Sequence, residues 1–147
     1  MVNEPKFSLK SIIYPNIYFE FNPTLPRESI FNLKPPLNFT IDMNGEIIIK
    51  NKDIFCSLYS KVKTGNSEFD DILRMQVIVT GFFQADIDMD DELIKRFSIN
   101  FYSILFPFLR HATNDVMLKN GIHFIMPIMN IANIIKDNEA CFVIKRI

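Results

Sequence analysis

The stretch from Ser103 to Ile135 constrains the fold most, because its hydrophobic residues recur with the period of a helix. From Ser103 onward, apolar residues return every three to four positions, as they do along one face of a helix. Ser103 is a suitable N-cap, and Lys119-Asn120-Gly121 is a typical helix stop. These signals predict a helix from Ser103 to Gly121.

A proline-punctuated connector and a second, short helix follow the predicted long helix. Ile122 to Met129 is almost wholly apolar around Pro127, and Ile131 to Ile135 has the spacing of a short helix. Connectors usually lie on the surface, so an apolar one is a candidate for binding. Ala140 to Ile147 has strand propensity, which leaves open whether this segment adds a fifth strand or forms a tail on the sheet edge.

The chain before this helical region has the alternating pattern of antiparallel strands. The clearest strand is Asp71 to Ile87, whose odd positions from Leu73 onward are all apolar or glycine. Leu9 to Phe21 also alternates, and Pro15 places that strand at an edge or a bend. We therefore expect an antiparallel sheet covered by the helical region.

Turn signals divide the remaining strand-like sequence. Leu37 to Met43 alternates and is followed by Asn44-Gly45, a strong hairpin signal because both residues tolerate positive φ. Glu46 to Lys63 then continues as strand, with an interruption around Asn51-Lys52 as an alternative. Four prolines between Asn22 and Pro36 exclude a long helix there.

Composition and charge exclude several classes of function. The net charge of −1, from 16 basic and 17 acidic residues, gives no reason to expect nucleic-acid binding. The N-terminus lacks the apolar segment of a secretory signal, and the apolar clusters are broken before the ~20 residues that a membrane helix needs. Cys56 and Cys141 are lone cysteines, expected to be small buried hydrophobes. We expect a cytoplasmic protein without membrane insertion.

No motif for catalysis or cofactor binding is present. With two His, four Gly and no nucleophile, zinc or phosphate-loop motif, the chain is not expected to be an enzyme or to need a cofactor. The acidic run from Asp86 begins like a calcium loop, but Asp91 and Phe97 stand where glycine and glutamate are required. The run is better interpreted as a connector leading into a helix, and we expect no metal site.

Three segments in the C-terminal half resemble the SecB family of export chaperones. They are Ile104 to Ala112 (ILFPFLRHA), Lys119 to Gly121, and Pro127 to Ile131. The family opens its long helix with I-L-F-P-[YF]-x-R, ends that helix near a glycine, and starts the second helix with P-[VI]-N-[FI]. Ile17 to Glu20 and Gly81 to Phe83 are similar to motifs in the family's strands, so the resemblance spans roughly residues 9 to 135.

The resemblance implies an α+β fold, in which a four-stranded antiparallel sheet is followed by a long helix and a short C-terminal helix. The chain would form a single SecB-like domain over residues 1–147, with strands at about 9–87, helices at about 103–137 and an unassigned tail at 138–147. It also implies a homotetramer built as a dimer of dimers.

The function implied by the resemblance is that of an ATP-independent chaperone, a holdase. It would bind unfolded or precursor polypeptides in apolar grooves, for protein export or for a dedicated client such as an antitoxin. The 15 Phe and 7 Met agree with this, because such side chains suit a surface that accepts many sequences. The alternative is a non-chaperone interaction or assembly subunit, whose apolar surface a protein partner covers permanently.

We predict the client-binding residues in the connector, the second helix and the first strand: Ile17, Phe19, Phe124, Ile125, Met126, Met129, Ile131 and Ile134. Residues predicted to pack the long helix or to form an oligomer interface are Leu105, Leu109, Ala112 and Val116. In the family, an acidic patch on the sheet docks the translocation motor ATPase. Here Glu20 is retained, but the other positions carry Asn16, Arg74 and Gln76, so this docking site is only partly matched.

Overall fold

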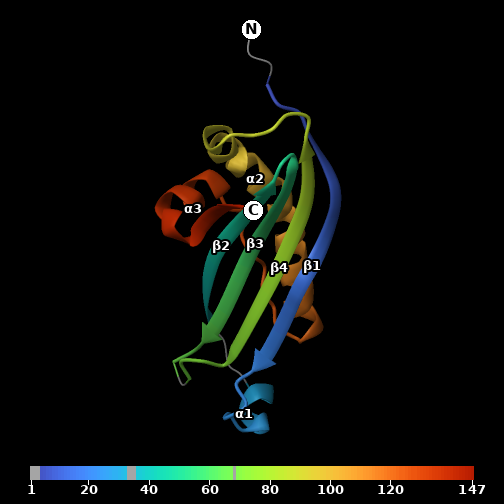
Figure 1. The fold of residues 1–147 in the computed structure, drawn as a ribbon. Coiled ribbons are helices and arrows are strands. Elements are labelled where there is room, and N and C mark those ends of the chain that lie inside the picture. The colour runs from blue at the N-terminus through green and yellow to red at the C-terminus, as the bar shows by residue number, and fades with distance from the viewer. Residues whose placement is uncertain (1–3, 33–35, 68) are drawn as a thin grey trace.

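One long sheet and one long helix dominate the structure, a computed structural model that describes residues 4–32, 36–67 and 69–147. The helix α2 crosses one face of the sheet, and the short helix α1 lies beyond one end of it (Figure 1). The elements in chain order are β1 (Phe7–Phe21), α1 (Arg27–Phe31), β2 (Asn38–Lys50), β3 (Asp53–Gly65), β4 (Leu73–Ala85), α2 (Asp91–Lys119), α3 (Ile131–Asp137), the 3-10 turn η1 (Glu139–Cys141) and β5 (Phe142–Arg146).

The sheet has five strands in the order β1-β4-β3-β2-β5. The first four are antiparallel, but β5 runs parallel to β2, so the predicted four-stranded antiparallel sheet is wrong in strand number and type. The tail supplies the extra strand because Phe142 to Arg146 pairs with the free edge of β2. At the other edge, the register of β1 shifts between Ile13 and Asn16, around Pro15, as expected for an edge strand with a bend.

The hairpin turn predicted at Asn44-Gly45 is wrong, because the chain turns at Asn51-Lys52. β2 and β3 pair without interruption from Asn38 opposite Gly65 to Lys50 opposite Asp53, and Asn51-Lys52 makes the turn. Asn51 takes the positive φ of 56° that such a turn requires. Gly45 is inside the strand for a different reason, since a Cβ there would stand 2.5 Å from Cε1 of Tyr102.

The long helix begins at Asp91, within the acidic run that starts at Asp86 and twelve residues before the predicted start at Ser103. Asp90 is the N-cap, and its carboxylate accepts a hydrogen bond from the backbone N–H of Leu93 at 2.8 Å. Ser103 and Pro107 are exposed positions within the helix. Water can reach the Ser103 carbonyl, which loses its helical partner at Pro107, so the proline is tolerated.

The core lies between α2 and the face of the sheet that it crosses. Alternate residues of β2, β3 and β4 point into it, among them Ile47, Leu58 and Val77, and all three are fully buried. Leu105 and Leu109 of α2 pack against them with no exposed surface. Among the described residues, no helix is both long and apolar enough to cross a membrane.

Candidate functional site

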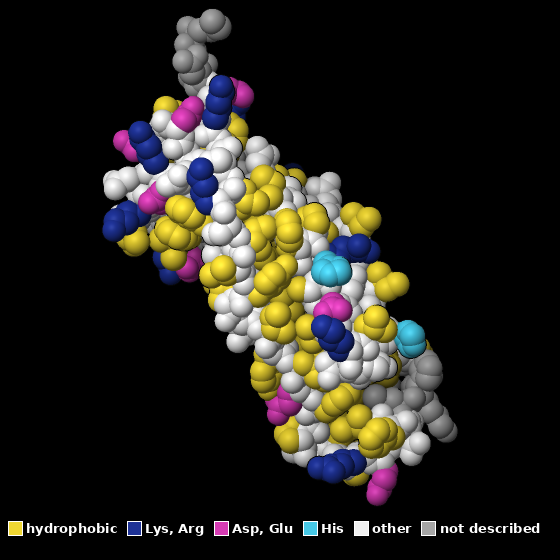
Figure 2. All heavy atoms as spheres, turned by 90° about the vertical axis from the view of Figure 1, so that its right-hand side faces the viewer, with side chains coloured by type: hydrophobic (Ala, Val, Ile, Leu, Met, Phe, Trp, Pro, Cys, Tyr) yellow, Lys and Arg dark blue, Asp and Glu magenta, His cyan; other side chains and the backbone are white. Residues whose placement is uncertain are grey.

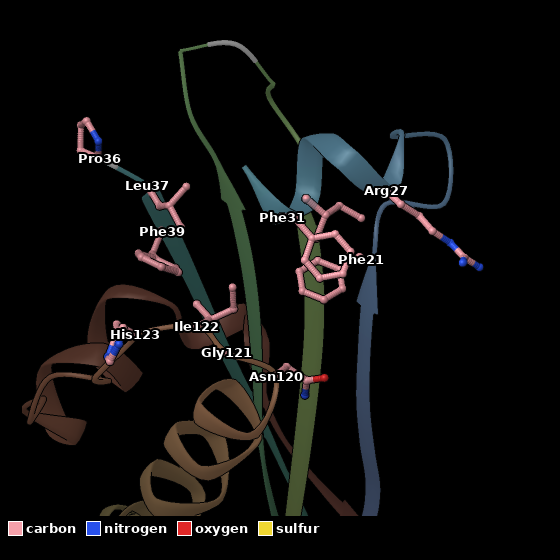
Figure 3. A pocket seen from close by; sticks show the side chains of 11 residues that line it. Phe21, Arg27, Phe31, Pro36, Leu37, Phe39, Asn120, Gly121, Ile122 and His123 are labelled. Carbon is pink, nitrogen blue, oxygen red and sulfur yellow. The ribbon is translucent and has the colours of Figure 1, made fainter. Parts of the chain in front are cut away.

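An apolar groove lies at the end of the sheet near α1, where four parts of the chain meet (Figure 3). It has a volume of about 980 Å³ and opens to solvent. We call it the end groove. Its apolar lining consists of Phe21, Ile30, Phe31, Pro36, Leu37, Phe39 and Ile122. The polar lining is Arg27, Asn120, Gly121 and His123.

Aromatic pairs support two walls of the end groove. Phe21 of β1 meets Phe19 edge to face, with ring centroids 5.0 Å apart. Phe39 of β2 packs against Phe124 of the connector, at 4.8 Å between centroids. Such contacts hold the rings in place, so the walls of the groove are formed before any ligand arrives.

Phe31 stands apart from these supported rings. It is 86% exposed although it points into the groove from α1 (Figure 3). The connector forms another wall, where Asn120 to His123 leaves the end of α2. Gly121 makes that exit with φ 77°, a backbone conformation that other residues rarely adopt.

Two polar side chains of α2 fix the connector. The amide of Met126 donates to Oδ1 of Asn114 at 2.7 Å, and its carbonyl accepts from Nε of Arg110 at 2.6 Å. The Met126 side chain between them is completely buried. Arg110 is the arginine of the helix motif, and its structural task here is to satisfy a buried backbone group.

The predicted client-binding residues do not converge on one surface. Met126 and Ile131 are buried in the core, while Ile125 is 75% exposed and points to solvent. Half-buried positions that pack against the core are Phe19, Phe124, Met129 and Ile134. Ile17 is 51% exposed on β1. Only Phe19 and Phe124 adjoin the end groove, through their contacts with Phe21 and Phe39.

The sequence reasoning missed most of the residues that line the groove. Phe31, Leu37 and Phe39 belong to or flank the proline-rich loop, which was read only as a break between strands. The available signal was Phe31, a large apolar side chain in a segment rich in turn residues. Such segments lie on the surface, where apolar side chains mark binding sites. The residues predicted to pack α2 lie inward, with Leu105 and Leu109 fully buried and Ala112 and Val116 partly so.

A second apolar surface follows β1 and the outer side of α2. Figure 2 shows hydrophobic side chains gathered in a band along the side of the molecule that carries β1. We call it the edge band. Exposed apolar residues of these two elements are Leu9, Ile13, Tyr14, Ile17 and Tyr18 of β1, with Ile104, Phe108 and Leu118 of α2. The pairing with β4 puts Ile13 and Tyr18 on the face away from α2, so the band wraps around the strand edge. A monomer seldom exposes so many apolar side chains beside an open strand edge.

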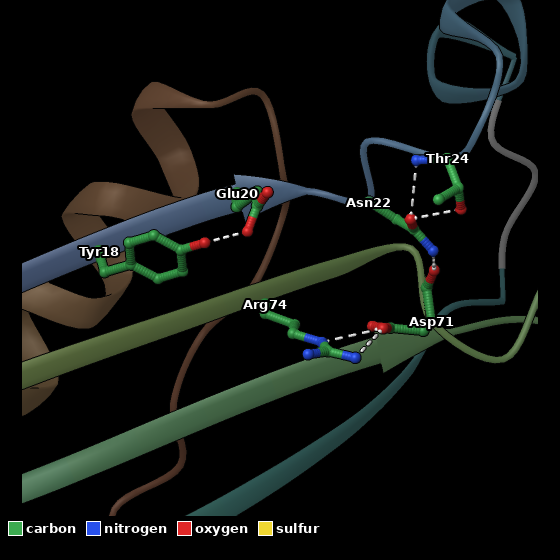
Figure 4. A network of polar contacts seen from close by, with 6 residues as sticks. All are labelled: Tyr18, Glu20, Asn22, Thr24, Asp71 and Arg74. Atoms are coloured by element: carbon green, nitrogen blue, oxygen red, sulfur yellow. Dashed lines mark hydrogen bonds and ion pairs between the residues drawn. The ribbon is translucent and has the colours of Figure 1, made fainter.

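The face of the sheet opposite α2 carries the positions of the expected docking patch. Asn16 and Gln76 are joined by a hydrogen bond between their amides at 3.1 Å, and both are neutral. Arg74 forms an ion pair with Asp71 at 2.7 Å (Figure 4). The hydroxyl of Tyr18 donates to the Glu20 carboxylate, and this hydrogen bond raises the pKa of Tyr18. These neutral and paired groups leave little free negative charge for a basic partner.

The two cysteines differ in environment. Cys56 is buried, and this burial raises the pKa of its thiol well above the ordinary value. Cys141 is exposed, contrary to the expectation that both would be buried. A group of three or more potential metal ligands does not occur in the described part of the chain.

No model of a protein family and no curated protein matches the sequence. Among solved structures, the chain is similar to a SecB-like chaperone of Mycobacterium tuberculosis, in complex with a ChAD peptide from the HigA1 antitoxin. The TM-score is 0.67 at 11% sequence identity, and the match covers 84% of this chain and 90% of that chain. The fold is SecB-like.

The resemblance read from the motifs of α2 is therefore confirmed for the fold. The match leaves only a small part of either chain outside the shared architecture. At 11% identity, the likeness shows the arrangement of elements and not the roles of individual residues.

Proposed function

We propose that this chain is an ATP-independent chaperone that holds an apolar segment of a non-native polypeptide in the end groove. The observation that carries the proposal is an open groove of about 980 Å³ with phenylalanine walls, in a SecB-like fold. A protein of the same fold has been solved with a peptide of an antitoxin, which supports a polypeptide as the ligand here.

The groove has the properties that a polypeptide client requires. Its volume lies at the upper end of the range for small-molecule pockets, so it can accept several side chains at once. Its lining is mainly phenylalanine, leucine and isoleucine, which attract apolar side chains without a fixed sequence code. Phe31 exposes 86% of its surface in the free chain, and a bound client would cover it.

A dedicated client fits this chain better than delivery to the translocation motor. The patch that would dock the motor ATPase has the neutral pair Asn16 and Gln76, and its cation Arg74 is already paired with Asp71. Glu20 is the retained acidic residue, and its carboxylate accepts a hydrogen bond from Tyr18. We therefore propose a role such as the protection of an antitoxin, with export as the less favoured alternative.

We also propose that copies of the chain associate through the edge band. β1 is the outer strand of the sheet, so its free edge and the apolar residues of α2 lie on the same side of the molecule. Pairing of β1 with a second β1 would satisfy the open backbone groups and bury exposed residues such as Ile13. A dimer of dimers remains the expected assembly.

The test is suppression of aggregation of a chemically unfolded model protein, measured by light scattering without ATP. We expect the chain to suppress aggregation at near-stoichiometric ratio. Phe31→Ser should weaken this suppression several-fold without loss of stability, because the ring is almost fully exposed. The matched control is Ile87→Ser, which removes another exposed apolar side chain, beyond the opposite end of β4.

No suppression at an excess of the chain would overturn the proposal. It would favour the alternative of an assembly subunit whose apolar surfaces a permanent partner covers. Equal losses in Phe31→Ser and Ile87→Ser would place client binding outside the end groove.

A further inference from the structure

The free edge of β2 is divided into an open part and a part covered by the chain's own C-terminus. β5 pairs with residues 45–49, from Gly45 opposite Phe142 to Ile49 opposite Arg146. Within the described chain, the strand pairing of residues 38–44 is with β3 only. The open part includes Phe39, which lines the end groove. A polypeptide that leaves the groove along β2 would therefore meet β5.

β5 is held mainly by ion pairs at the surface and buries little of its side-chain area. Four of its five residues are exposed, and only the Phe142 ring packs inward, against Tyr102 at 5.2 Å between centroids. Lys145 pairs with Glu46 at 3.1 Å, and Arg146 pairs with Asp91 at 2.6 Å. Such partly exposed ion pairs stabilise weakly, and a short parallel pairing is less stable than an antiparallel one.

The hydroxyl of Tyr102, next to the start of β5, is an unsatisfied polar group. Tyr102 is 1% exposed, yet its hydroxyl has no hydrogen-bond partner among the residues that the structure describes. A Cβ on Gly45 would stand 2.7 Å from this hydroxyl, so the group lies directly at the junction of the open and covered parts. Beside it is a hollow of about 420 Å³, lined in part by Tyr102, Ile135, Phe142 and Ile144.

We propose that β5 is a self-docked strand that competes with the client for residues 45–49 of β2. This inference rests on the proposed function and names its regulation. A client segment in extended conformation adds to the open edge at residues 38–44, and a longer one displaces β5. The displaced edge then offers backbone partners, and the hollow next to Tyr102 accepts a further side chain. In the free chain, β5 protects this edge from pairing with other molecules.

A reversible lock on β5 tests the competition. Glu46 and Val143 are register neighbours on adjacent strands, which is the spacing that a disulfide requires. The locked variant is Glu46→Cys with Val143→Cys, in a Cys141→Ser background that removes the exposed native thiol. Its matched control is Lys61→Cys with Gln76→Cys in the same background, which joins β3 to β4, away from the β2 edge proposed for the client.

The probe is a fluorescein-labelled unfolded protein, reduced and carboxymethylated α-lactalbumin, and binding is measured by anisotropy. We expect the oxidised lock to bind the probe several-fold more weakly than its reduced form, while the control pair binds equally in both states. Equal or tighter binding by the oxidised lock overturns the competition. If no form of either variant binds the probe, the proposed function itself fails.

Hydrogen exchange on the unmodified chain gives a second readout. Addition of the probe should speed exchange at the amides of Val143 to Arg146 and slow it at residues 38–44. Unchanged exchange in β5 while the end groove becomes protected would show that client and β5 do not compete, and would overturn the inference.

Discussion

A single glycine shows how a side chain from a distant element can explain a residue choice. Asn44-Gly45 has the composition of a hairpin turn, yet both residues lie within β2. Gly45 is required because the Tyr102 ring of α2 rests on its backbone, where a Cβ would approach Cε1 to 2.5 Å. The ring is buried among core residues, so it cannot move away cheaply.

Gly45→Ala should therefore destabilise the chain. The added methyl group would overpack the core, at a cost of about 1–3 kcal/mol. This cost exceeds the roughly 0.5–1 kcal/mol by which alanine is favoured over glycine within a strand. Urea unfolding followed by circular dichroism measures the change. In a Tyr102→Ala background, the same substitution should cost much less, because the clashing ring is absent. An equal cost in both backgrounds would contradict the explanation.

The start of α2 shows how an element is defined by its cap and its buried stripe together. Asp90 caps the helix, and the acidic residues Asp91 and Glu92 fall in its first turn, where the helix dipole favours them. The turns before Ser103 bury Ile94, Phe101 and Tyr102. This spacing continues the same stripe, so the helix extends to the acidic run.

Asp90→Ala should lower the free energy of unfolding by about 1 kcal/mol, because the N–H of Leu93 loses its acceptor. Ser103→Ala is the matched control, since Ser103 was the cap predicted from the sequence and is an exposed mid-helix residue. It should change stability by less than about 0.5 kcal/mol. Thermal or urea unfolding compares the two variants. A larger loss of unfolding free energy for Ser103→Ala than for Asp90→Ala would contradict the helix start at Asp91.

For the whole molecule, the division of apolar surface is the main result. The core is closed between α2 and the sheet, while the end groove and the edge band remain open. In the proposed function, the concave groove takes a side chain of the client. The band, which follows a free strand edge, is the surface proposed for a second copy of the chain.

Ile13→Lys tests the edge band. A lysine at this exposed position of β1 places a charge on the strand edge and opposes pairing with another strand. We expect the mass measured by light scattering after size exclusion to fall from that of an oligomer toward that of a smaller species. Ile87→Lys, at an exposed site outside the band, should leave the mass unchanged. A monomeric unmodified chain would contradict the proposed association.

Local sequence patterns were sufficient for β1, for β4 and for the presence of a helical region that covers the sheet. The alternation of β4, the edge character of β1 around Pro15 and the apolar stripe of α2 all follow from short-range periodicity, which depends only on neighbouring residues. The motif around Pro107 indicated the SecB-like fold for the same reason, because the match needs only residue order and spacing.

Long-range contacts account for what the sequence pattern missed. Gly45 lies inside a strand because of Tyr102, β5 forms because the edge of β2 is free, and the end groove exists because Phe31, Phe39 and Ile122 meet from three segments. Each of these depends on residues far apart in the chain. The apolar stretch from Ser103 to Ile135 predicted an apolar surface on the connector, but long-range packing buries the Met126 side chain in the core and leaves Ile125 exposed.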